Sequence, residues 1–270
     1  MKTEELKDVC RLVRRDIVAS LCAAKSGHPG GSLSAVEIVT ALYFAKMNID
    51  PKDPKKADRD RFVLSKGHAA PVLYSVLAER GYFDPSELLT LRKMGSFLQG
   101  HPDAKKCPGV DASTGSLGQG VSIATGMALG AKLARSNIQV YTLVGDGECQ
   151  EGLVWEAAEA AAHYKLDNLT VLLDNNGLQI DGSNREVMDV RDLAAKYKAF
   201  GFETLEVADG NDIEQVLAAL NTPRTAGKPR MILFHTTKGK GVSFMENQVG
   251  WHGKAPSQEQ CAQALSELEG

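Results

Sequence analysis

The sequence predicts an α/β protein with a doubly wound, mainly parallel sheet and helices on both faces. Short apolar runs of strand length alternate along the chain with longer segments in which apolar residues recur at helical spacing. Glycine and polar residues follow several of these runs, as expected where parallel strands end at a ligand-binding edge. The length of 270 residues, with 43% hydrophobic residues, is enough to bury one large core or two small ones.

The positions of the individual elements follow from these patterns. Strands are expected at 61–64, 138–144, 169–173, 202–207 and 231–235. Helices are expected at 4–24, 35–45, 71–80, 86–93, 121–135, 153–165, 190–199, 213–220 and 257–269. Ser34, with Glu37 three residues later, is expected to cap the second helix in a capping box. Because no repeat, linker or low-complexity segment interrupts this order, residues 1–270 are expected to form a single domain.

Composition excludes several classes of function. The net charge is −3 and no basic block is present, so no nucleic-acid partner is expected. No apolar run reaches the roughly 18 residues needed to span a bilayer, and residues 1–16 lack a signal-peptide core. No membrane partner is therefore expected, and the expected location is cytoplasmic. The five cysteines are odd in number, widely spaced and without a Cys-x-x-Cys pair, which argues against disulfides and zinc.

The stretch 144–182 is the most informative about chemistry. One apolar run ends at Gly-Asp-Gly, a helical segment follows, and the next apolar run ends at Asn-Asn-Gly. This is the pattern of a βαβ unit, in which both strand ends lie at one edge of the sheet. Asp146 and Asn176, which follow the two runs, are hard oxygen donors. Such donors suit Mg²⁺ or Ca²⁺ better than zinc.

Glycines on both sides of the aspartate favour binding of a phosphate group. Gly145 and Gly147 lack Cβ atoms, so backbone N–H groups can approach a phosphate, and the following helix adds a positive dipole end. Either Gly-Asp-Gly or Asn-Asn-Gly alone is more often only a turn. With 27 residues between Gly147 and Asn175, containing a helix and a strand, the pair resembles the thiamine diphosphate (ThDP) binding signature. The pair therefore predicts a site for a metal-bridged diphosphate.

Four of the six histidines lie in loops that contain glycine or proline. Three of the four directly follow a glycine, and the four are His28, His68, His101 and His252. A single loop histidine is more often solvated, but four in such similar settings on a βα scaffold favour function. Their spacing excludes a local metal motif and suits recognition of hydroxyl and phosphate groups and proton transfer near neutral pH. His163 and His235 are expected to be structural.

These motifs, in this order, are similar to those of the N-terminal part of transketolase. The matching stretches are Ser-Gly-His-Pro-Gly-Gly at 26–31, Ser-Lys-Gly-His-Ala at 65–69, Gly-His-Pro-Asp at 100–103, Thr-Gly-Ser-Leu-Gly-Gln-Gly at 114–120, the Gly-Asp-Gly to Asn-Asn pair, Thr-Thr-Lys-Gly-Lys-Gly at 236–241 and Trp-His-Gly at 251–253. Deoxyxylulose-phosphate synthase and the 2-oxo-acid dehydrogenases share the metal–diphosphate signature. The His-Pro sequences at 28 and 101 favour transketolase over both. The resemblance implies the fold of a ThDP diphosphate-binding domain.

The resemblance also implies which residues bind the metal and the diphosphate. The side chains of Asp146 and Asn176 and the carbonyl of Leu178 would bind Mg²⁺ or Ca²⁺. Gly147 would donate its N–H to the diphosphate of ThDP. Lys238, in the matching Lys-Gly segment, would contribute cofactor-side electrostatics.

The resemblance also implies roles for residues near the rings of the cofactor and near the substrate. The aminopyrimidine and thiazolium pocket would be lined by Gly115, Ser116 and Leu117. His68 and His252 would lie near the diphosphate, with His252 also facing the substrate. His101 would hold the hydroxyl of the transferred two-carbon unit, and His28 would contact substrate hydroxyls and help to move protons. Glu151 resembles a glutamate in the charge network that links the two active sites of the family's dimer.

The chain departs from the family pattern in its length. A full transketolase adds a pyrimidine-binding domain and a C-terminal domain, which hold the glutamate that protonates the pyrimidine ring and most acceptor-phosphate contacts. The resemblance therefore implies that these domains lie on a separate chain. A C-terminal transketolase subunit is the expected partner, in a heterotetramer with two copies of each chain.

The function implied by the resemblance is transfer of a two-carbon ketol group from a ketose phosphate to an aldose phosphate, as in the pentose phosphate pathway. The enzyme would be active only with its partner chain. Two alternatives remain open at this point. One is a non-catalytic ThDP-binding or regulatory paralogue, and the other is a related ThDP enzyme subunit with an unusual sugar acceptor.

Overall fold

The computed structural model describes residues 1–269, which are built around a five-stranded parallel sheet. The strands are β1 (Arg61–Leu64), β2 (Val140–Gly145), β3 (Leu169–Asn175), β4 (Glu203–Val207) and β5 (Arg230–His235). Their spatial order is β1-β2-β3-β5-β4, and each adjacent pair runs parallel. All five predicted strands are present within two residues of their expected limits. The predicted fold class is confirmed.

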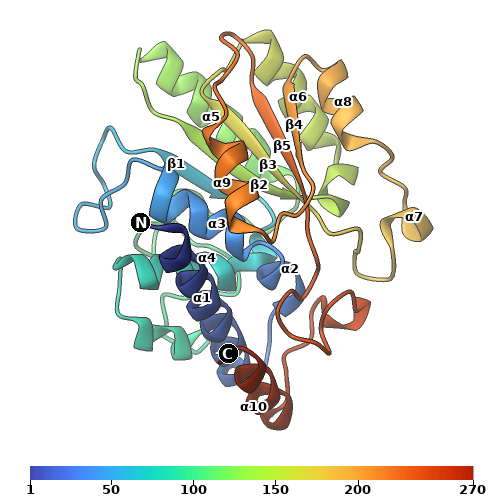
Figure 1. Ribbon diagram of the computed structural model, residues 1–270. Coiled ribbons are helices and arrows are strands. Elements are labelled where there is room, and N and C mark those ends of the chain that lie inside the picture. The colour runs from blue at the N-terminus through green and yellow to red at the C-terminus, as the bar shows by residue number, and fades with distance from the viewer. Residues whose placement is uncertain (270) are drawn as a thin grey trace.

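Helices cover both faces of the sheet (Figure 1). They are α1 (Thr3–Ala24), α2 (Pro29–Leu33), α3 (Val36–Ala41), α4 (Ala70–Arg80), α5 (Gln119–Leu133), α6 (Gly152–His163), α7 (Asn184–Val187), α8 (Leu193–Ala199), α9 (Ile213–Asn221) and α10 (Gln258–Glu267). Figure 1 shows α10 beside the C-terminal end of α1. Within the described residues, no helix is both long enough and apolar enough to cross a membrane.

Each central strand is buried in two separate hydrophobic layers. In β2, Leu143 packs with α1, α3, α4 and α9, whereas Val144 packs with α5, α6 and α8. In β3, Leu172 and Leu173 divide between the layers in the same way. Successive side chains of a strand point to opposite faces, so a strand covered on both sides is apolar at almost every position. This burial explains why the strands occur in the sequence as continuous apolar runs.

The predicted capping box at the start of α3 is wrong. Its N-cap residue is Ala35, which makes no side-chain cap hydrogen bond. Ser34 is fully buried, and its Oγ donates to Asp174 Oδ2 at 2.5 Å. Glu37 forms an ion pair with Arg14. Both side chains therefore bind residues far away in the sequence. The buried carboxylate of Asp174 needs hydrogen-bond donors, and the buried guanidinium of Arg14 needs an acceptor.

Other element boundaries differ from those expected. The expected helix at 35–45 is α3 followed by a π-helical turn, η1 (Leu42–Lys46), and the expected helix at 86–93 is a 3₁₀ segment, η3 (Pro85–Thr90). Two short helices, α2 and α7, lie where only loops were predicted. The sequence of α2, Pro-Gly-Gly-Ser-Leu, has the composition of a turn. All five of its residues are buried, so packing decides its conformation.

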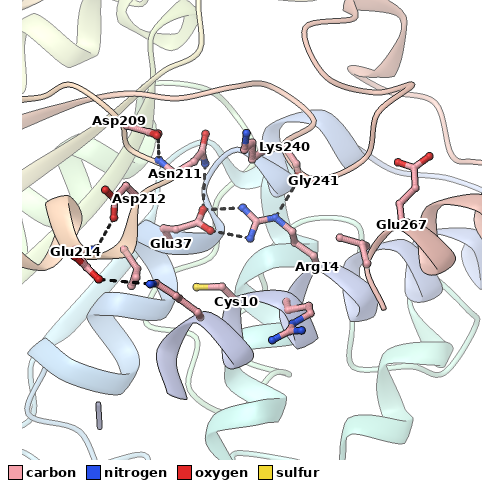
Figure 2. Close-up of a pocket in the computed structure, with 14 residues that line it drawn as sticks. Cys10, Arg14, Glu37, Asp209, Asn211, Asp212, Glu214, Lys240, Gly241 and Glu267 are labelled. Atoms are coloured by element: carbon pink, nitrogen blue, oxygen red, sulfur yellow. Dashed lines mark hydrogen bonds and ion pairs between the residues drawn. The ribbon is translucent and has the colours of Figure 1, made fainter. Parts of the chain in front are cut away.

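A buried ion pair joins α1 to α3 beside the loop that follows β5 (Figure 2). Arg14 and Glu37 are 8% and 5% exposed, and their charged groups approach to 2.7 Å. Arg14 Nε donates to the carbonyl of Lys240 at 3.1 Å, and Asn211 Nδ2 donates to Glu37 Oε2 at 3.1 Å. Asn211 Oδ1 in turn accepts the N–H of Thr237 at 2.8 Å. The ion pair therefore positions the segment that runs from Thr237 to Lys240.

Replacement of Arg14 tests this arrangement. In Arg14→Met the Glu37 carboxylate would remain buried without its cation, and we expect a loss of about 3–5 kcal/mol in the free energy of unfolding. Urea denaturation measures this loss. Arg14→Met/Glu37→Gln should lose less than Arg14→Met, because no unpaired charge is left. Arg11→Met removes an exposed arginine from the same helix and should change stability by less than about 0.5 kcal/mol. A loss below about 1 kcal/mol in Arg14→Met would contradict the prediction.

Candidate functional site

The carboxyl ends of β2 and β3 bring the two predicted metal-ligand segments together. The register pairs the last residue of β2, Gly145, with Asp174, and the N–H of Asp146 donates to the Asp174 carbonyl at 3.2 Å. The carboxylate of Asp146 accepts the N–H of Gly177, beyond the end of β3, at 2.6 Å. Two segments that are 27 residues apart in the sequence are therefore neighbours at one edge of the sheet, as the βαβ pattern predicted.

A cavity of about 340 Å³ lies at this edge. Its lining includes all but two of the candidate site residues: His28, His68, Gly115, Leu117, Asp146, Gly147, Glu151, Asn176, Leu178, Lys238 and His252. The two exceptions, His101 and Ser116, are both exposed. The structure thus brings together residues from six separate sequence motifs, although their chemical roles remain predictions.

Oxygen atoms in the cavity form a donor set for a hard cation. Asp146 is 2% exposed, and no cation of residues 1–269 lies within ion-pair distance of its carboxylate. Burial, and then the neighbouring Asp174, raise the pKa of Asp146 to about 6. The Asn176 amide and the Leu178 carbonyl lie in the same cavity. One carboxylate without a cation, together with neutral oxygens, fits the ligand preference of Mg²⁺ or Ca²⁺.

Three of the four candidate histidines form a cluster in the cavity. The ring centroids of His28 and His68 are 5.3 Å apart, those of His28 and His252 5.5 Å, and those of His68 and His252 5.2 Å. The Nδ1 atom of His28 is buried and has no hydrogen-bond partner in the described part of the chain. An unpaired buried nitrogen of this kind is available to a ligand.

The cluster is electrically neutral near pH 7. Burial, followed by repulsion from nearby cationic groups, lowers the pKa of His28 and of His252 to about 4 and that of His68 well below its usual range. Neutral imidazoles can both donate and accept hydrogen bonds. The three rings can therefore hold hydroxyl groups and exchange protons with a ligand.

Lys238 links the histidine cluster to the predicted metal ligands. Its side chain is buried, and Nζ lies 3.2 Å from the Leu178 carbonyl oxygen and 3.1 Å from His252 Nδ1. Burial lowers the pKa of the ammonium group to about 8, although Asp146 acts in the opposite direction. Lys238 therefore places a cation on the side of the cavity where the diphosphate is predicted.

His101 lies outside the cluster but against the glycine-rich turn. A Cβ atom on Gly115 would stand 3.2 Å from His101 Cγ, and Gly115 has a φ of +157°, so close approach of the ring requires glycine. The hydroxyl of Tyr74 donates to the His101 carbonyl at 3.0 Å. His101 is thus held at the rim of the cavity, beside the predicted ring pocket.

Sequence reasoning missed two buried charges beneath the cavity. Lys66 is 2% exposed, Asp174 is fully buried, and the two form an ion pair. Lys66 Nζ also donates to the Gly31 carbonyl at 2.7 Å, and Asp174 accepts from the hydroxyls of Ser34 and Thr236. Burial alone would raise the pKa of the Asp174 carboxyl, but Lys66 and the two hydroxyls hold it below its usual value. The aspartate that directly follows the apolar run of β3 was the available signal.

A third missed residue, Glu148, holds three loops of the site together. It is 3% exposed and accepts the Ser65 hydroxyl at 2.5 Å, the Gly118 N–H at 2.9 Å and the Gly145 N–H at 3.1 Å. Burial raises the pKa of this carboxyl. Glu151, three residues later, is exposed at the cavity. Its predicted role in a charge network between active sites stays a prediction.

Comparison with known proteins then assigns the chain to a family. A family model described as the thiamine diphosphate binding domain of transketolase matches residues 3–269. The chain belongs to the transketolase family. It is a transketolase-type enzyme subunit that contains the ThDP-binding domain.

Relatives of two sizes match this transketolase chain. It is 41% identical to an apulose-4-phosphate transketolase subunit of Phocaeicola vulgatus, over 99% of this chain and 95% of that protein. It is 42% identical to a 6-deoxy-6-sulfo-D-fructose transketolase subunit of a Clostridium species, over 98% of this chain and 96% of that protein. It is 41% identical to human transketolase, over 99% of this chain but 42% of the human protein.

Solved transketolase structures have the same fold over the whole chain. A transketolase variant from Pichia stipitis matches with a TM-score of 0.92 and 34% identity, covering 100% of this chain and 41% of that one. The Leishmania mexicana transketolase matches with a TM-score of 0.91 and 34% identity, covering 99% and 41%. The chain therefore spans about two fifths of the length of these enzymes.

Helix α5 packs closely against the residue that follows β1, and glycine substitutions in α5 can test this contact. A Cβ atom on Gly120 would lie 2.5 Å from the Ser65 Cα atom, whereas nothing lies within 4 Å of a Cβ atom on Gly126 in the same helix. Gly120→Ala should therefore destabilise the protein by about 1–3 kcal/mol. Gly126→Ala should stabilise it by about 0.5–1 kcal/mol, because alanine loses less backbone entropy in a helix.

Thermal and urea unfolding of both variants measure these opposite effects. Stabilisation by Gly120→Ala would show that the loop bearing Ser65 and His68 is not in close contact with α5.

Proposed function

We propose that this chain is the N-terminal subunit of a split transketolase. Together with a partner subunit that carries the pyrimidine-binding and C-terminal domains, it would transfer a two-carbon ketol group from a ketose phosphate to an aldose phosphate. The observation that carries the proposal is a relative: the chain matches 95% of a protein that is itself named as one subunit of a transketolase, and 42% of human transketolase. We propose that the remaining part of the active site comes from a partner chain.

The cavity at the ends of β2 and β3 is the proposed cofactor site. Asp146, Asn176 and the Leu178 carbonyl would hold Mg²⁺, or Ca²⁺, and the metal would bridge to the diphosphate of ThDP. The N–H of Gly147 and the ammonium group of Lys238 would contact the same diphosphate. When bound, ThDP supplies the carbanion chemistry. The chain itself binds and orients that group.

The histidines are the proposed substrate-side groups. His68 and His252 would contact the diphosphate side of the cofactor, and the unpaired Nδ1 of His28 would bind a substrate hydroxyl. His101, beside the glycine-rich turn, would hold the hydroxyl of the two-carbon unit. The pKa values of His28 and His252, near 4, support neutral rings that accept a proton from a hydroxyl and return it.

The proposed partner covers the open side of the cavity. Glu151 and Ile180 line the cavity, and their exposure supports burial of this region by another protein. A heterotetramer with two copies of each chain would place Glu151 between two active sites. The substrates would be sugar phosphates, and most contacts to the acceptor phosphate would come from the partner.

A related ThDP enzyme with an unusual sugar is a second candidate function. Two relatives that match over nearly their whole length carry names that refer to apulose 4-phosphate and to 6-deoxy-6-sulfo-D-fructose. The full-length human relative has the general name transketolase. A substrate screen should therefore include branched and sulfonated ketoses beside ordinary ketose phosphates.

Metal binding is tested by Asp146→Asn. The substitution removes the only negative charge among the three proposed metal ligands but keeps an oxygen for the backbone donors. We expect the affinity for Mg²⁺ and ThDP together to fall by at least about tenfold, as measured by calorimetry on the assembled enzyme. Asp181→Asn, at an exposed aspartate of the neighbouring loop, is the matched control and should bind normally. Unchanged affinity in Asp146→Asn would remove this residue from the site.

Activity is tested by reconstitution. The tagged chain is isolated from its native host, and the complex is weighed by mass spectrometry. We expect a stoichiometric partner of roughly the size of two further domains, on the order of 300 residues. The complex should transfer a ketol group in the presence of ThDP and Mg²⁺, whereas each chain alone should be inactive. A chain that is recovered alone, or a complex without ketol transfer, would favour a non-catalytic ThDP-binding role.

A further inference from the structure

A second enclosed cavity, of about 230 Å³, lies at the amino-terminal edge of the sheet. It is bounded by the starts of β2, β3 and β5, the end of α9 and the end of η1. Its polar lining includes Lys46, Gln139, Tyr141, Thr170, Arg224 and Arg230. The six residues of β2, at roughly 3.3 Å each, separate it from the cofactor cavity by about 20 Å. The two cavities therefore lie at opposite edges of the sheet.

The charges that line this cavity are all positive. They are Lys46, Arg224 and Arg230, and no aspartate or glutamate lines it. Arg230 is 1% exposed and already has an anionic partner, Glu203, at 2.8 Å. The other two cations have neutral partners only, as far as the described residues extend.

Arg224 and Lys46 retain hydrogen-bonding capacity. The guanidinium of Arg224 donates to Thr170 Oγ1 at 2.6 Å and to the Leu169 carbonyl at 2.7 Å, whereas its Nε is buried without a partner within residues 1–269. Lys46 Nζ donates to the Asn221 side-chain oxygen at 3.2 Å. A buried donor without an acceptor costs about 1–3 kcal/mol. A ligand that supplies acceptors would recover this energy.

The cations also repel one another. Burial, and then Arg224 and Arg230, lower the pKa of Lys46, and burial followed by Arg230 lowers that of Arg224. The carboxylate of Asp60 is nearby, but it accepts the backbone N–H groups of Asn48 and Gln139, each at 2.9 Å. Glu203 and Asp167 act against the lowering at Arg224, and Asp60 against that at Lys46, but the pKa of each cation is still lowered. An anion in the cavity would therefore reduce the remaining repulsion.

One neutral group distinguishes between kinds of anion. Gln139 Oε1 is buried and accepts no hydrogen bond in the described chain, while Gln139 Nε2 is occupied by the Asn137 carbonyl at 3.1 Å. A ligand that satisfies this oxygen must carry a proton as well as negative charge. Near neutral pH inorganic phosphate carries both, and so does the monoanion of a phosphate monoester, whereas a sulfate or a carboxylate has no O–H group to donate.

We propose that this cavity is a binding site for phosphate, either inorganic phosphate or the monoanionic, singly protonated phosphate group of a monoester. Two phosphate oxygens accept hydrogen bonds from Lys46 and Arg224, and the P–OH group donates to Gln139 Oε1. The hydroxyl of Tyr141 lines the same cavity and can donate to a remaining oxygen. The proposal does not depend on the ketol-transfer function, because the site is at the opposite edge of the sheet.

The test uses the full chain and inorganic phosphate at constant ionic strength, set with chloride, with and without ThDP and Mg²⁺. We expect the thermal midpoint to rise with phosphate and to saturate, whether or not ThDP and Mg²⁺ are present. Sulfate at the same concentrations should stabilise less, because it leaves Gln139 Oε1 unpaired. A monoester such as glycerol phosphate distinguishes the two sources, since it binds only if the cavity admits the attached carbon.

Lys46→Met provides the decisive variant, since it keeps the apolar stem and removes the charge. Phosphate affinity should fall at least tenfold, while the midpoint in phosphate-free buffer should rise because repulsion with the two arginines is removed. Lys93→Met, at an exposed lysine far from the cavity in sequence, should leave both quantities unchanged. A purely structural role for Lys46 would instead lower the midpoint in both buffers.

Three results would overturn the proposal. Phosphate stabilisation that is equal in Lys46→Met and the unmodified chain would place the ligand elsewhere. Stabilisation that disappears when ThDP and Mg²⁺ are added would place it in the cofactor cavity. Equal midpoints in phosphate, sulfate and chloride would show that no specific anion binds.

Discussion

The buried ion pair between Lys66 and Asp174 lies beneath the cofactor cavity and contacts most of the segments that form it. Through Asp174 it holds β3, Ser34 and Thr236, and through Lys66 it holds the loop after β1 and the Gly31 carbonyl. Removing either partner would leave a charge in the interior, where it costs several kcal/mol. The loops that carry the histidines are therefore positioned by a core interaction, and their own turn sequences are secondary. Glu148 adds a second such link among neighbouring segments, with three hydrogen bonds that satisfy its buried carboxyl.

Burial also sets the protonation state of the site. The cavity contains the side chains of Lys66 and Lys238 and three packed histidines, so additional positive charge is unfavourable and the imidazoles stay neutral. The only carboxylate proposed as a metal ligand, Asp146, has no cation of its own among the described residues. These two features are complementary. Cationic and neutral donors line the side where a diphosphate would lie, and Asp146, Asn176 and Leu178 supply oxygen atoms on the side where a divalent metal would lie.

The two edges of the sheet illustrate how one scaffold creates two different environments. At the carboxyl edge β2 ends in Gly145, and Gly177 lies just beyond the end of β3, so backbone and ligand can approach closely there. At the amino edge the chain instead places Lys46, Arg224 and Arg230 around a small enclosed space. Among residues 1–269, only Arg230 has an acidic partner there, so this edge retains positive charge. A parallel sheet positions such groups accurately at both ends, because its strands are held in register along their whole length.

The sequence by itself determined the fold class and all five strands, and all but two of its candidate site residues line one cavity, because buried parallel strands are continuous apolar runs and the site motifs immediately follow them. It did not determine the partners of buried charges. Ser34 and Glu37 have the spacing of a capping box, yet Ser34 donates to Asp174 and Glu37 forms an ion pair with Arg14. The clustering of His28, His68 and His252, the exclusion of His101 from that cluster, and the unpaired cations near β5 were likewise decided by tertiary structure. The physical reason is that a local sequence pattern reflects only the conformational preferences of a few neighbouring residues. A buried charge, in contrast, can pair with any segment that packing brings within a few ångströms.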